Sequence, residues 1–281
     1  MNCKNCNADL PQDARFCLQC GGRVVDQSLT FGYLATEASE RFFNFENNFL
    51  WRTFKDMFRK PEMVIDGFID GVRKRHMNVF NYLALAITLS GLQIFLMQKF
   101  FTTNMDLSWM LPEDNPMNGN LGFMDVFLEY QSALYIIFIP IYAIFAWLTF
   151  LNLKKYSYLK HVVITTYSQA HLSIFMVIPT IVCLMLGFNF FKFVYFFSFP
   201  FMILYSAYVY KRLYKFSVRR IIWKTIWFLI ITGGIYIIFN IIVWVILFAT
   251  GAVDLQKMMD AQKAQQEATS YIVSSAINWT S

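Results

Sequence analysis

The sequence predicts an all-α membrane protein with about five transmembrane helices and a small N-terminal zinc ribbon held by four cysteines. Composition is the first observation: hydrophobic residues make up 57% of the 281 residues and charged residues 15%, whereas an average soluble domain has about 45–50% and about 25%. The second is that the apolar residues are grouped in runs long enough to cross a bilayer. The third is a pair of Cys-x2-Cys motifs near the N-terminus.

Five apolar runs define a transmembrane domain over residues 79–250. A helix of about 20 apolar residues crosses the hydrocarbon core, and each run reaches about that length. The turn between the third and fourth runs is short, so a re-entrant hairpin remains an alternative to two full crossings. A polar tail follows at residues 251–281. The expected spans cover about residues 79–101, 130–151, 162–186, 190–210 and 225–250.

The distribution of lysine and arginine predicts the orientation. Basic residues precede the first span and fill the loops before the third and fifth spans, whereas the loop between the first two spans has neither Lys nor Arg. Because basic loops stay on the cytoplasmic side, we expect a cytoplasmic N-terminus and an extracytoplasmic tail. The first residues lack the apolar stretch of a signal peptide, which agrees with a cytoplasmic start.

Residues 1–23 form the cysteine module. Its two pairs are separated by ten residues, and a two-residue spacing lets both sulfurs of a pair reach one ion. Four thiolates complete a tetrahedral shell, so the expected cofactor is a structural Zn²⁺ with no open position for catalysis. A module of this size cannot bury enough core to fold alone, so the metal would supply its folding energy. The predicted ligands are Cys3, Cys6, Cys17 and Cys20.

Neighbouring residues support the metal interpretation. Asn7 follows the first pair, and Gly21 and Gly22 follow the second, and these residue types tolerate the positive φ that a tight turn after a metal knuckle needs. Two disulfides or four unrelated thiols are the alternatives, although a reducing cytosol disfavours disulfides. Cys183 lies within the third span and is interpreted as a packing residue.

Residues 24–78 are interpreted as a cytoplasmic linker followed by amphipathic juxtamembrane helices. A helix over residues 49–60 would gather large apolar side chains on one face, with basic residues beside it. That form is typical of a helix lying on an anionic leaflet. The alternative is that the aromatic side chains pack against the transmembrane bundle or a partner chain. The basic residues expected at the membrane surface are Arg52, Lys55, Arg59, Arg73, Lys74 and Arg75.

The third span is the most polar. His171 lies about ten residues into it, roughly 15 Å deep at 1.5 Å per residue. An ionisable group at that depth is a functional candidate, and the alternative is a neutral histidine that hydrogen-bonds between helices. The intramembrane polar candidates, which share one helical stripe, are His161, Thr165, Ser168, Gln169 and His171.

The sequence also lacks most catalytic patterns. No Asp or Glu occurs between Glu129 and Asp254, which removes carboxylate relays and carboxylate metal sites from most of the spans. No zinc-protease, nucleophile-elbow, phosphate-loop or dinucleotide motif is present. We therefore expect a protein that is not an enzyme. No internal repeat is evident.

Four groups of residues together form a recognisable pattern. They are Cys3-Lys-Asn-Cys6 with Phe16-Cys17-Leu-Gln-Cys20-Gly21, Arg59-Lys-Pro61 with Phe68-Ile-Asp-Gly71-Val-Arg73-Lys, Asn78-Val-Phe80-Asn-Tyr-Leu83, and Lys160-His161-Val-Val with His171-Leu-Ser. This pattern resembles the DUF3667 family, and the resemblance covers most of the chain. It implies a bacterial membrane protein of unknown function, mainly from Bacteroidetes, in the inner membrane. The five-span topology is also similar to that of Yip1-type proteins.

The leading hypothesis is a non-enzymatic integral membrane protein whose zinc ribbon acts as a cytoplasmic docking or scaffold module. Its expected partners are a cytoplasmic protein or anionic lipid headgroups. The net charge of +6 is assigned to cytoplasmic loops, so no nucleic acid is expected, and the oligomeric state is left open. One alternative is a transporter or channel that moves an anionic or lipid cargo along the polar face of the third span. The other is an intramembrane enzyme.

Overall fold

The computed structural model describes residues 2–11, 14–24, 30, 32, 34, 47–105 and 122–249. The predicted tail at residues 251–281 and most of the predicted linker lie outside these residues. The chain divides into two compact units, Met1–Phe228 and Leu229–Ser281, and each is considered by itself. Every regular element in the described part is a helix, apart from two isolated β-bridges near the N-terminus, which confirms the predicted all-α class.

Two helices precede the first span. Helix α2 (Asn47–Arg59) ends two residues before Pro61. A proline disfavours helical backbone at the residue before it, and the backbone of Lys60 is accordingly not helical. Helix α3 (Pro61–Ile69) then starts with that proline at its first turn, where the missing N–H costs nothing. Gly71, with φ of +96°, provides the left-handed residue that ends α3.

The first two spans are continuous helices. Helix α4 (Val79–Phe100) is capped by the Asn78 side chain, which accepts a hydrogen bond from the Phe80 backbone N–H at 2.9 Å. A short 3-10 turn, η1 (Thr102–Asn104), follows α4. Helix α5 (Gly122–Phe150) contains Pro140 in its interior and continues into the 3-10 turn η3 (Leu151–Leu153).

The third and fourth spans form a tight hairpin. Helix α6 (Tyr158–Met185) ends before Gly187, whose φ is +80°, so the predicted turn is present. The fourth span starts as α7 (Phe190–Phe193), passes through the π-helix η4 (Val194–Ser198), and continues as α8 (Phe199–Tyr214).

The fifth span lies within the long helix α9 (Val218–Ala249). Five helical segments of the described chain are long and apolar enough to cross a membrane, which confirms the predicted number of spans. The third and fourth segments each have the length of a full crossing, 28 and 25 residues. The segments are Val79–Phe100, Leu134–Leu153, Tyr158–Met185, Phe190–Tyr214 and Val218–Ile242.

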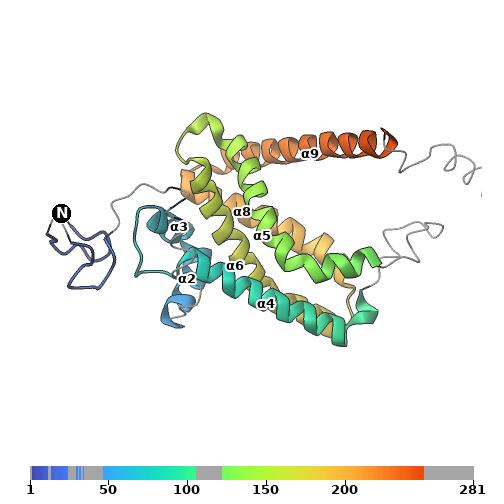
Figure 1. The fold of residues 1–281 in the computed structure, drawn as a ribbon, viewed down its shortest axis with the longest axis horizontal. Coiled ribbons are helices and arrows are strands. Elements are labelled where there is room, and N and C mark those ends of the chain that lie inside the picture. Colours follow the sequence, from blue (N-terminus) through green and yellow to red (C-terminus); the bar gives the residue numbers. More distant parts are fainter. Residues whose placement is uncertain are drawn as a thin grey trace, which may run out of the picture. The chain divides into compact units, whose positions relative to one another are not determined.

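Helix α6 is the centre of the bundle. It packs against α4, α5 and α8, and also against the juxtamembrane helices α2 and α3 (Figure 1). The main hydrophobic core gathers side chains from all of these helices, including Met57 of α2 and Ile65 of α3, both fully buried. Helix α2 is therefore a packed element of the bundle, which favours the second of the two interpretations drawn from the sequence.

Candidate metal centre and intramembrane polar site

The four predicted metal ligands come together at one point. The sulfurs of Cys3, Cys6, Cys17 and Cys20 all lie within 4.8 Å of one another. Cys3 Sγ is 3.7 Å from Cys20 Sγ, and Cys6 Sγ is 3.6 Å from Cys17 Sγ. A tetrahedral zinc site with Zn–S bonds of about 2.3 Å places its sulfurs about 3.8 Å apart, whereas a disulfide needs about 2.0 Å. The donor set therefore fits one tetrahedral metal ion and excludes two disulfides in this structure.

The cysteine module is an internal repeat that the sequence analysis missed. The Asn7 N–H donates to the Cys3 carbonyl at 2.8 Å, and fourteen positions later the Gly21 N–H donates to the Cys17 carbonyl at 2.7 Å. Asn7 and Gly21 have φ of 61° and 62°, as their residue types predicted. The bridges repeat with the same offset, since Asn2 pairs with Asp9 and Phe16 with Arg23. The equal spacing of the two cysteine pairs was the signal that could have revealed this repeat.

The ribbon leaves apolar side chains uncovered on its second knuckle. Leu18 is 96% exposed and Phe16 is 58% exposed, although they flank the buried Cys17. The ribbon's own buried hydrophobic cluster consists of Cys3, Leu10 and Cys17. Because Leu18 protrudes instead of joining this cluster, its side chain contributes little to the folding of the module.

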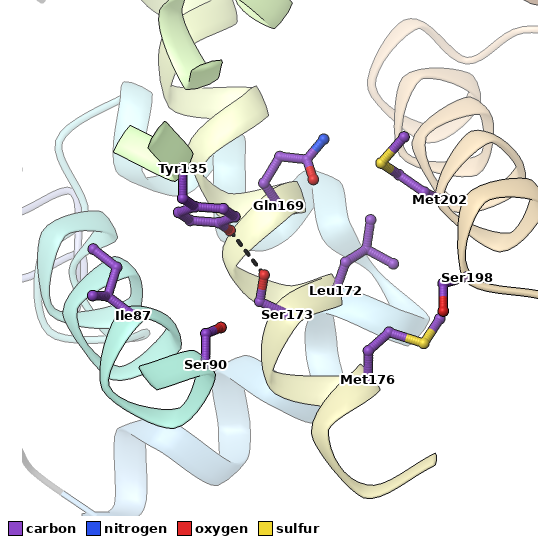
Figure 2. A pocket seen from close by; sticks show the side chains of 9 residues that line it. All are labelled: Ile87, Ser90, Tyr135, Gln169, Leu172, Ser173, Met176, Ser198 and Met202. Atoms are coloured by element: carbon purple, nitrogen blue, oxygen red, sulfur yellow. Dashed lines mark hydrogen bonds between the residues drawn. The ribbon is translucent and has the colours of Figure 1, made fainter. Parts of the chain in front are cut away.

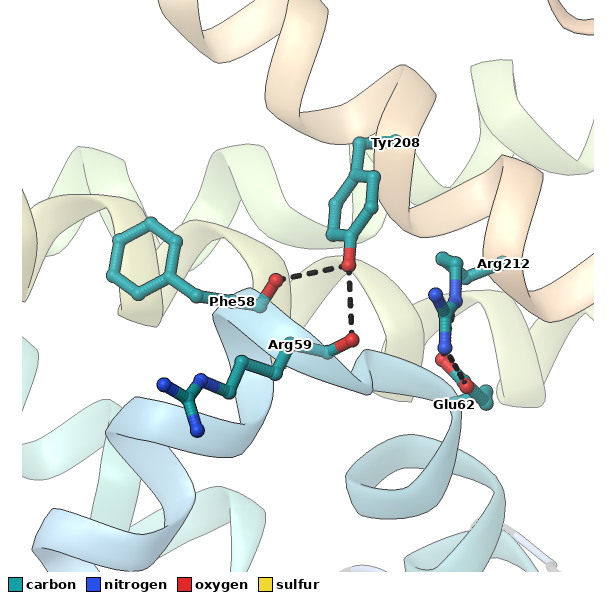
Figure 3. A network of polar contacts seen from close by, with 5 residues as sticks. All are labelled: Phe58, Arg59, Glu62, Tyr208 and Arg212. Carbon is teal, nitrogen blue, oxygen red and sulfur yellow. Dashed lines mark hydrogen bonds and ion pairs between the residues drawn. The ribbon is translucent and has the colours of Figure 1, made fainter. Parts of the chain in front are cut away.

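Two tyrosines of α8 hold the junction between α2 and α3. The Met57 carbonyl would normally accept from the N–H four residues later, but that residue is Pro61, which has none. The Tyr205 hydroxyl donates to the Met57 carbonyl instead, at 3.1 Å. The Tyr208 hydroxyl donates to the next two carbonyls, those of Phe58 at 2.8 Å and Arg59 at 3.2 Å (Figure 3). Pro61 thus frees the Met57 carbonyl, and the end of α2 frees the next two, so that all three accept hydrogen bonds from α8.

An ion pair fixes the first turn of α3 to the end of α8. Arg212 binds Glu62 through two nitrogens, with Nε 3.1 Å from Oε2 and Nη2 on Oε1 (Figure 3). Burial by itself would raise the pKa of Glu62, but the hydrogen bond and charge of Arg212 hold it below its ordinary value. The sequence analysis singled out neither residue, because their positions are 150 residues apart.

Two further polar contacts of the juxtamembrane region were also missed. The Tyr156 hydroxyl donates to Asp66 Oδ1 at 2.8 Å, and burial raises the pKa of Asp66 above its ordinary value. His76 Nε2 lies 3.0 Å from Asp56 Oδ2, and burial lowers the pKa of His76 although Asp56 opposes this effect. The first contact holds α3 in place, and the second joins the loop after α3 to α2. No local sequence pattern marks either of them.

Five of the six predicted surface basic residues are exposed. Arg73 is the exception, since it is 7% exposed. Its Nη1 donates to the Phe68 carbonyl at 2.6 Å, and its guanidinium lies 4.2 Å from the centre of the Phe68 ring. Arg73 therefore stabilises the end of α3 rather than facing a membrane surface. The exposed residues are Arg52, Lys55, Arg59, Lys74 and Arg75.

His171 is fully buried in an aromatic cage. Its Nδ1 is 2.7 Å from the Tyr82 hydroxyl on α4, while its ring lies 4.3 Å from that of Phe58, edge to face. Phe54 and Tyr205 complete the cage, at 5.0 and 5.3 Å between ring centres. Among the described residues, His171 Nε2 has no hydrogen-bond partner. These contacts support the interpretation of His171 as a histidine that joins helices.

The other polar candidates of α6 do not share one path with His171. His161 is fully buried, with Nδ1 3.1 Å from the Ser157 carbonyl. Thr165 is buried, and the buried Ser168 donates to the Ile164 carbonyl of its own helix. Gln169 instead lines a cavity between α4, α5, α6 and the fourth span. The predicted stripe is therefore divided between packed residues and one residue that opens onto a cavity.

The contact between Tyr82 and His171 gives a stability prediction. Tyr82→Phe should leave the buried imidazole without its hydrogen bond and lower the free energy of unfolding by about 1–3 kcal/mol. Unfolding in detergent micelles with increasing denaturant measures this loss. Tyr130→Phe is the matched control, because Tyr130 is 55% exposed. Replacing both partners, Tyr82→Phe with His171→Leu, should recover part of the loss. Equal unfolding midpoints for Tyr82→Phe and Tyr130→Phe would refute the role of this hydrogen bond.

Comparison with known proteins adds a family match to this geometry. The family model described as "Protein of unknown function (DUF3667)" matches residues 48–91. These residues comprise nearly all of α2, the whole of α3 and somewhat more than half of α4, so the match includes the two helices that precede the first span. The match confirms the family resemblance over these residues. No curated protein and no solved structure matches the chain.

Proposed function

For a membrane protein whose residues 48–91 match a family of unknown function, we propose a non-enzymatic docking role. The four cysteines hold a structural Zn²⁺, and the ribbon that this ion folds presents a surface to a partner in the cytoplasm. The protein lies in the inner membrane of a bacterium. Its N-terminus is cytoplasmic and its C-terminus extracytoplasmic, because segments rich in Lys and Arg alternate with segments that have few or none.

The exposure of Leu18 carries this proposal. A leucine that is 96% exposed on a metal-folded module does nothing for the module itself. Four thiolates fill a tetrahedral shell, so the metal has no position left for a substrate. A closed metal site beside protruding apolar side chains is better suited to binding than to chemistry. The expected partner is a cytoplasmic protein with an apolar recess that accepts Leu18 and Phe16.

The exposed basic residues support a second contact, with anionic lipid headgroups. Arg52, Lys55 and Arg59 of α2 are exposed, while the opposite side of the helix is packed in the bundle. Near a negatively charged leaflet each such residue adds about 1 kcal/mol of attraction. This contact would hold the cytoplasmic face of the bundle against the headgroups.

Capture of partners from solubilised membranes tests the docking role. Tagged full-length protein is cross-linked in cells, purified, and its partners are quantified by mass spectrometry. We expect Leu18→Ser to lose a partner that the wild type retains, while zinc content is unchanged. Gln19→Ser is the matched control, because Gln19 is the next residue and is also exposed. An identical set of partners for the wild type, Leu18→Ser and the zinc-ligand variant Cys17→Ser would overturn the proposal.

A further inference from the structure

A cavity of about 290 Å³ lies within the bundle, at the level of the spans. Helix α4 supplies Ile87 and Ser90 on one side, α5 supplies Tyr135, and the fourth span closes the other side (Figure 2). Helix α6 provides the wall between them. Ser90 and Gln169 each lie eleven residues from the cytoplasmic start of their helices, α4 and α6, or roughly 16 Å along the axis at 1.5 Å per residue. Both residues therefore lie well inside helical segments that are long and apolar enough to cross a membrane.

Polar side chains from three helices and the π-helix η4 face this cavity. The Ser173 hydroxyl donates to the Tyr135 hydroxyl at 3.1 Å, which leaves the Tyr135 proton available to a ligand (Figure 2). Gln169 has no hydrogen bond to any residue that the structure describes. An amide without a hydrogen-bond partner is unfavourable in an apolar environment. The cavity thus offers donors that a ligand could satisfy.

The charge of the cavity restricts the ligand. None of the nine residues that line it is charged. A phosphate or carboxylate there would be desolvated without a counter-charge, which is strongly unfavourable. The ligand must therefore be uncharged. The Gln169 amide supplies two N–H donors, and the hydroxyls of Ser90 and Ser198 supply one O–H donor each. A head group with carbonyl oxygens can accept from these donors.

The remaining walls favour a flat ring. Met176 and Met202 line the cavity, and thioethers make favourable contacts with ring edges. The Tyr135 ring offers a face for stacking. Ser198 is the last residue of the π-helix η4, an irregularity that occurs frequently at functional sites. Most of the lining side chains are only half-buried, so a head group could enter from the bilayer while its apolar tail stays in lipid.

We propose that this cavity binds the uncharged, carbonyl-bearing head of a membrane amphiphile, with a quinone as the ligand. Gln169 and Tyr135 donate to the carbonyl oxygens, and Ser90 and Ser198 contribute further hydrogen bonds. The methionines and Tyr135 hold the ring. Ester carbonyls of a diacylglycerol share the same acceptor chemistry, so the experiment must separate the two sources.

Photo-crosslinking tests this site in the full-length chain. The protein is reconstituted into nanodiscs of phosphatidylcholine and labelled with a photoreactive short-chain quinone, and the labelled peptides are identified by mass spectrometry. We expect labelling on α6 or the fourth span that an unlabelled quinone suppresses. Gln169→Leu should weaken binding about tenfold, the effect of one lost hydrogen bond to the ligand. Ser90→Leu, which fills part of the cavity, should also weaken it.

Gln93→Leu is the matched control, because Gln93 lies in α4, does not line the cavity, and donates to Met97 Sδ at 3.7 Å. It should label like the wild type. Competition by diacylglycerol but not by unlabelled quinone would overturn the assignment of a quinone as the ligand. It would still support a ligand with a carbonyl-bearing head. Equal competition by phosphatidic acid would overturn the requirement for an uncharged head. Labelling that is unchanged in both Gln169→Leu and Ser90→Leu would overturn the site. A monodisperse elution profile establishes that each variant is folded.

Discussion

Removing the metal from the ribbon should unfold that module and leave the transmembrane helices folded. The hydrophobic cluster within the ribbon consists of Cys3, Leu10 and Cys17, so apolar burial cannot stabilise it alone. Structural zinc contributes about 10–16 kcal/mol of apparent binding free energy in zinc-finger peptides. We expect one zinc ion per purified chain, and rapid protease cleavage within residues 1–23 after treatment with a strong chelator. Helical circular dichroism should barely change.

The fifth cysteine provides the control for this experiment. Cys17→Ser removes a ligand from the cluster and should abolish stoichiometric zinc, whereas Cys183→Ser lies in α6, far along the chain, and should leave it unchanged. Incubation with other divalent ions after chelation tests metal identity, since a four-thiolate tetrahedral site suits zinc. A ribbon that stays resistant to protease without metal would refute the structural role of the ion.

Truncating Met57 should destabilise the whole bundle. Its side chain is fully buried in the main core, and a buried methionine replaced by alanine costs about 2–5 kcal/mol of unfolding free energy. Trp51 lies on the same helix and is larger, but it is 68% exposed. Trp51→Ala should therefore change the free energy of unfolding by no more than about 0.5 kcal/mol. Denaturant unfolding of the purified protein in micelles compares the two variants directly.

This comparison distinguishes a packed helix from an interfacial one. If α2 lay on the leaflet, the large Trp51 would be the principal anchor and Met57 would be one apolar contact among several. A greater loss for Trp51→Ala than for Met57→Ala would therefore contradict the packed arrangement. Tyr205→Phe gives an independent measure, because it removes the donor on the Met57 carbonyl without creating a cavity.

The spans and the cysteine cluster were predictable from local patterns. Hydrocarbon requires every backbone group of a crossing segment to be satisfied within a helix, so a run of about 20 apolar residues suffices to identify each span. The tetrahedral demand of one metal ion fixes the spacing of Cys3 with Cys6 and of Cys17 with Cys20. These constraints act over short stretches of chain, and a single sequence therefore reveals them.

The placement of α2 was not predictable in this way. An apolar face beside basic residues suits a leaflet and a protein groove equally well, so Phe54, Met57 and Phe58 left both interpretations open. In the structure α2 packs into the bundle, where Tyr205 donates to the Met57 carbonyl that Pro61 leaves without a donor and Tyr208 donates to the Phe58 carbonyl at the end of α2. The exposure predicted for Arg73 was wrong for a related reason. An arginine beside two other basic residues is expected to face solvent, and only the structure shows its guanidinium packed on the Phe68 ring.

The sequence by itself determined the membrane class, the number of candidate spans and the cysteine cluster that could hold a metal ion, because each depends on composition or spacing along one segment. Only the tertiary structure decided what surrounds these groups. Tyr82 is 89 residues from His171 in sequence, and Tyr135 is 38 residues from Ser173. Such pairs arise from the packing of helices against one another, which no periodicity within one helix encodes. The same packing separates Gln169 from the buried histidines and leaves it facing a cavity.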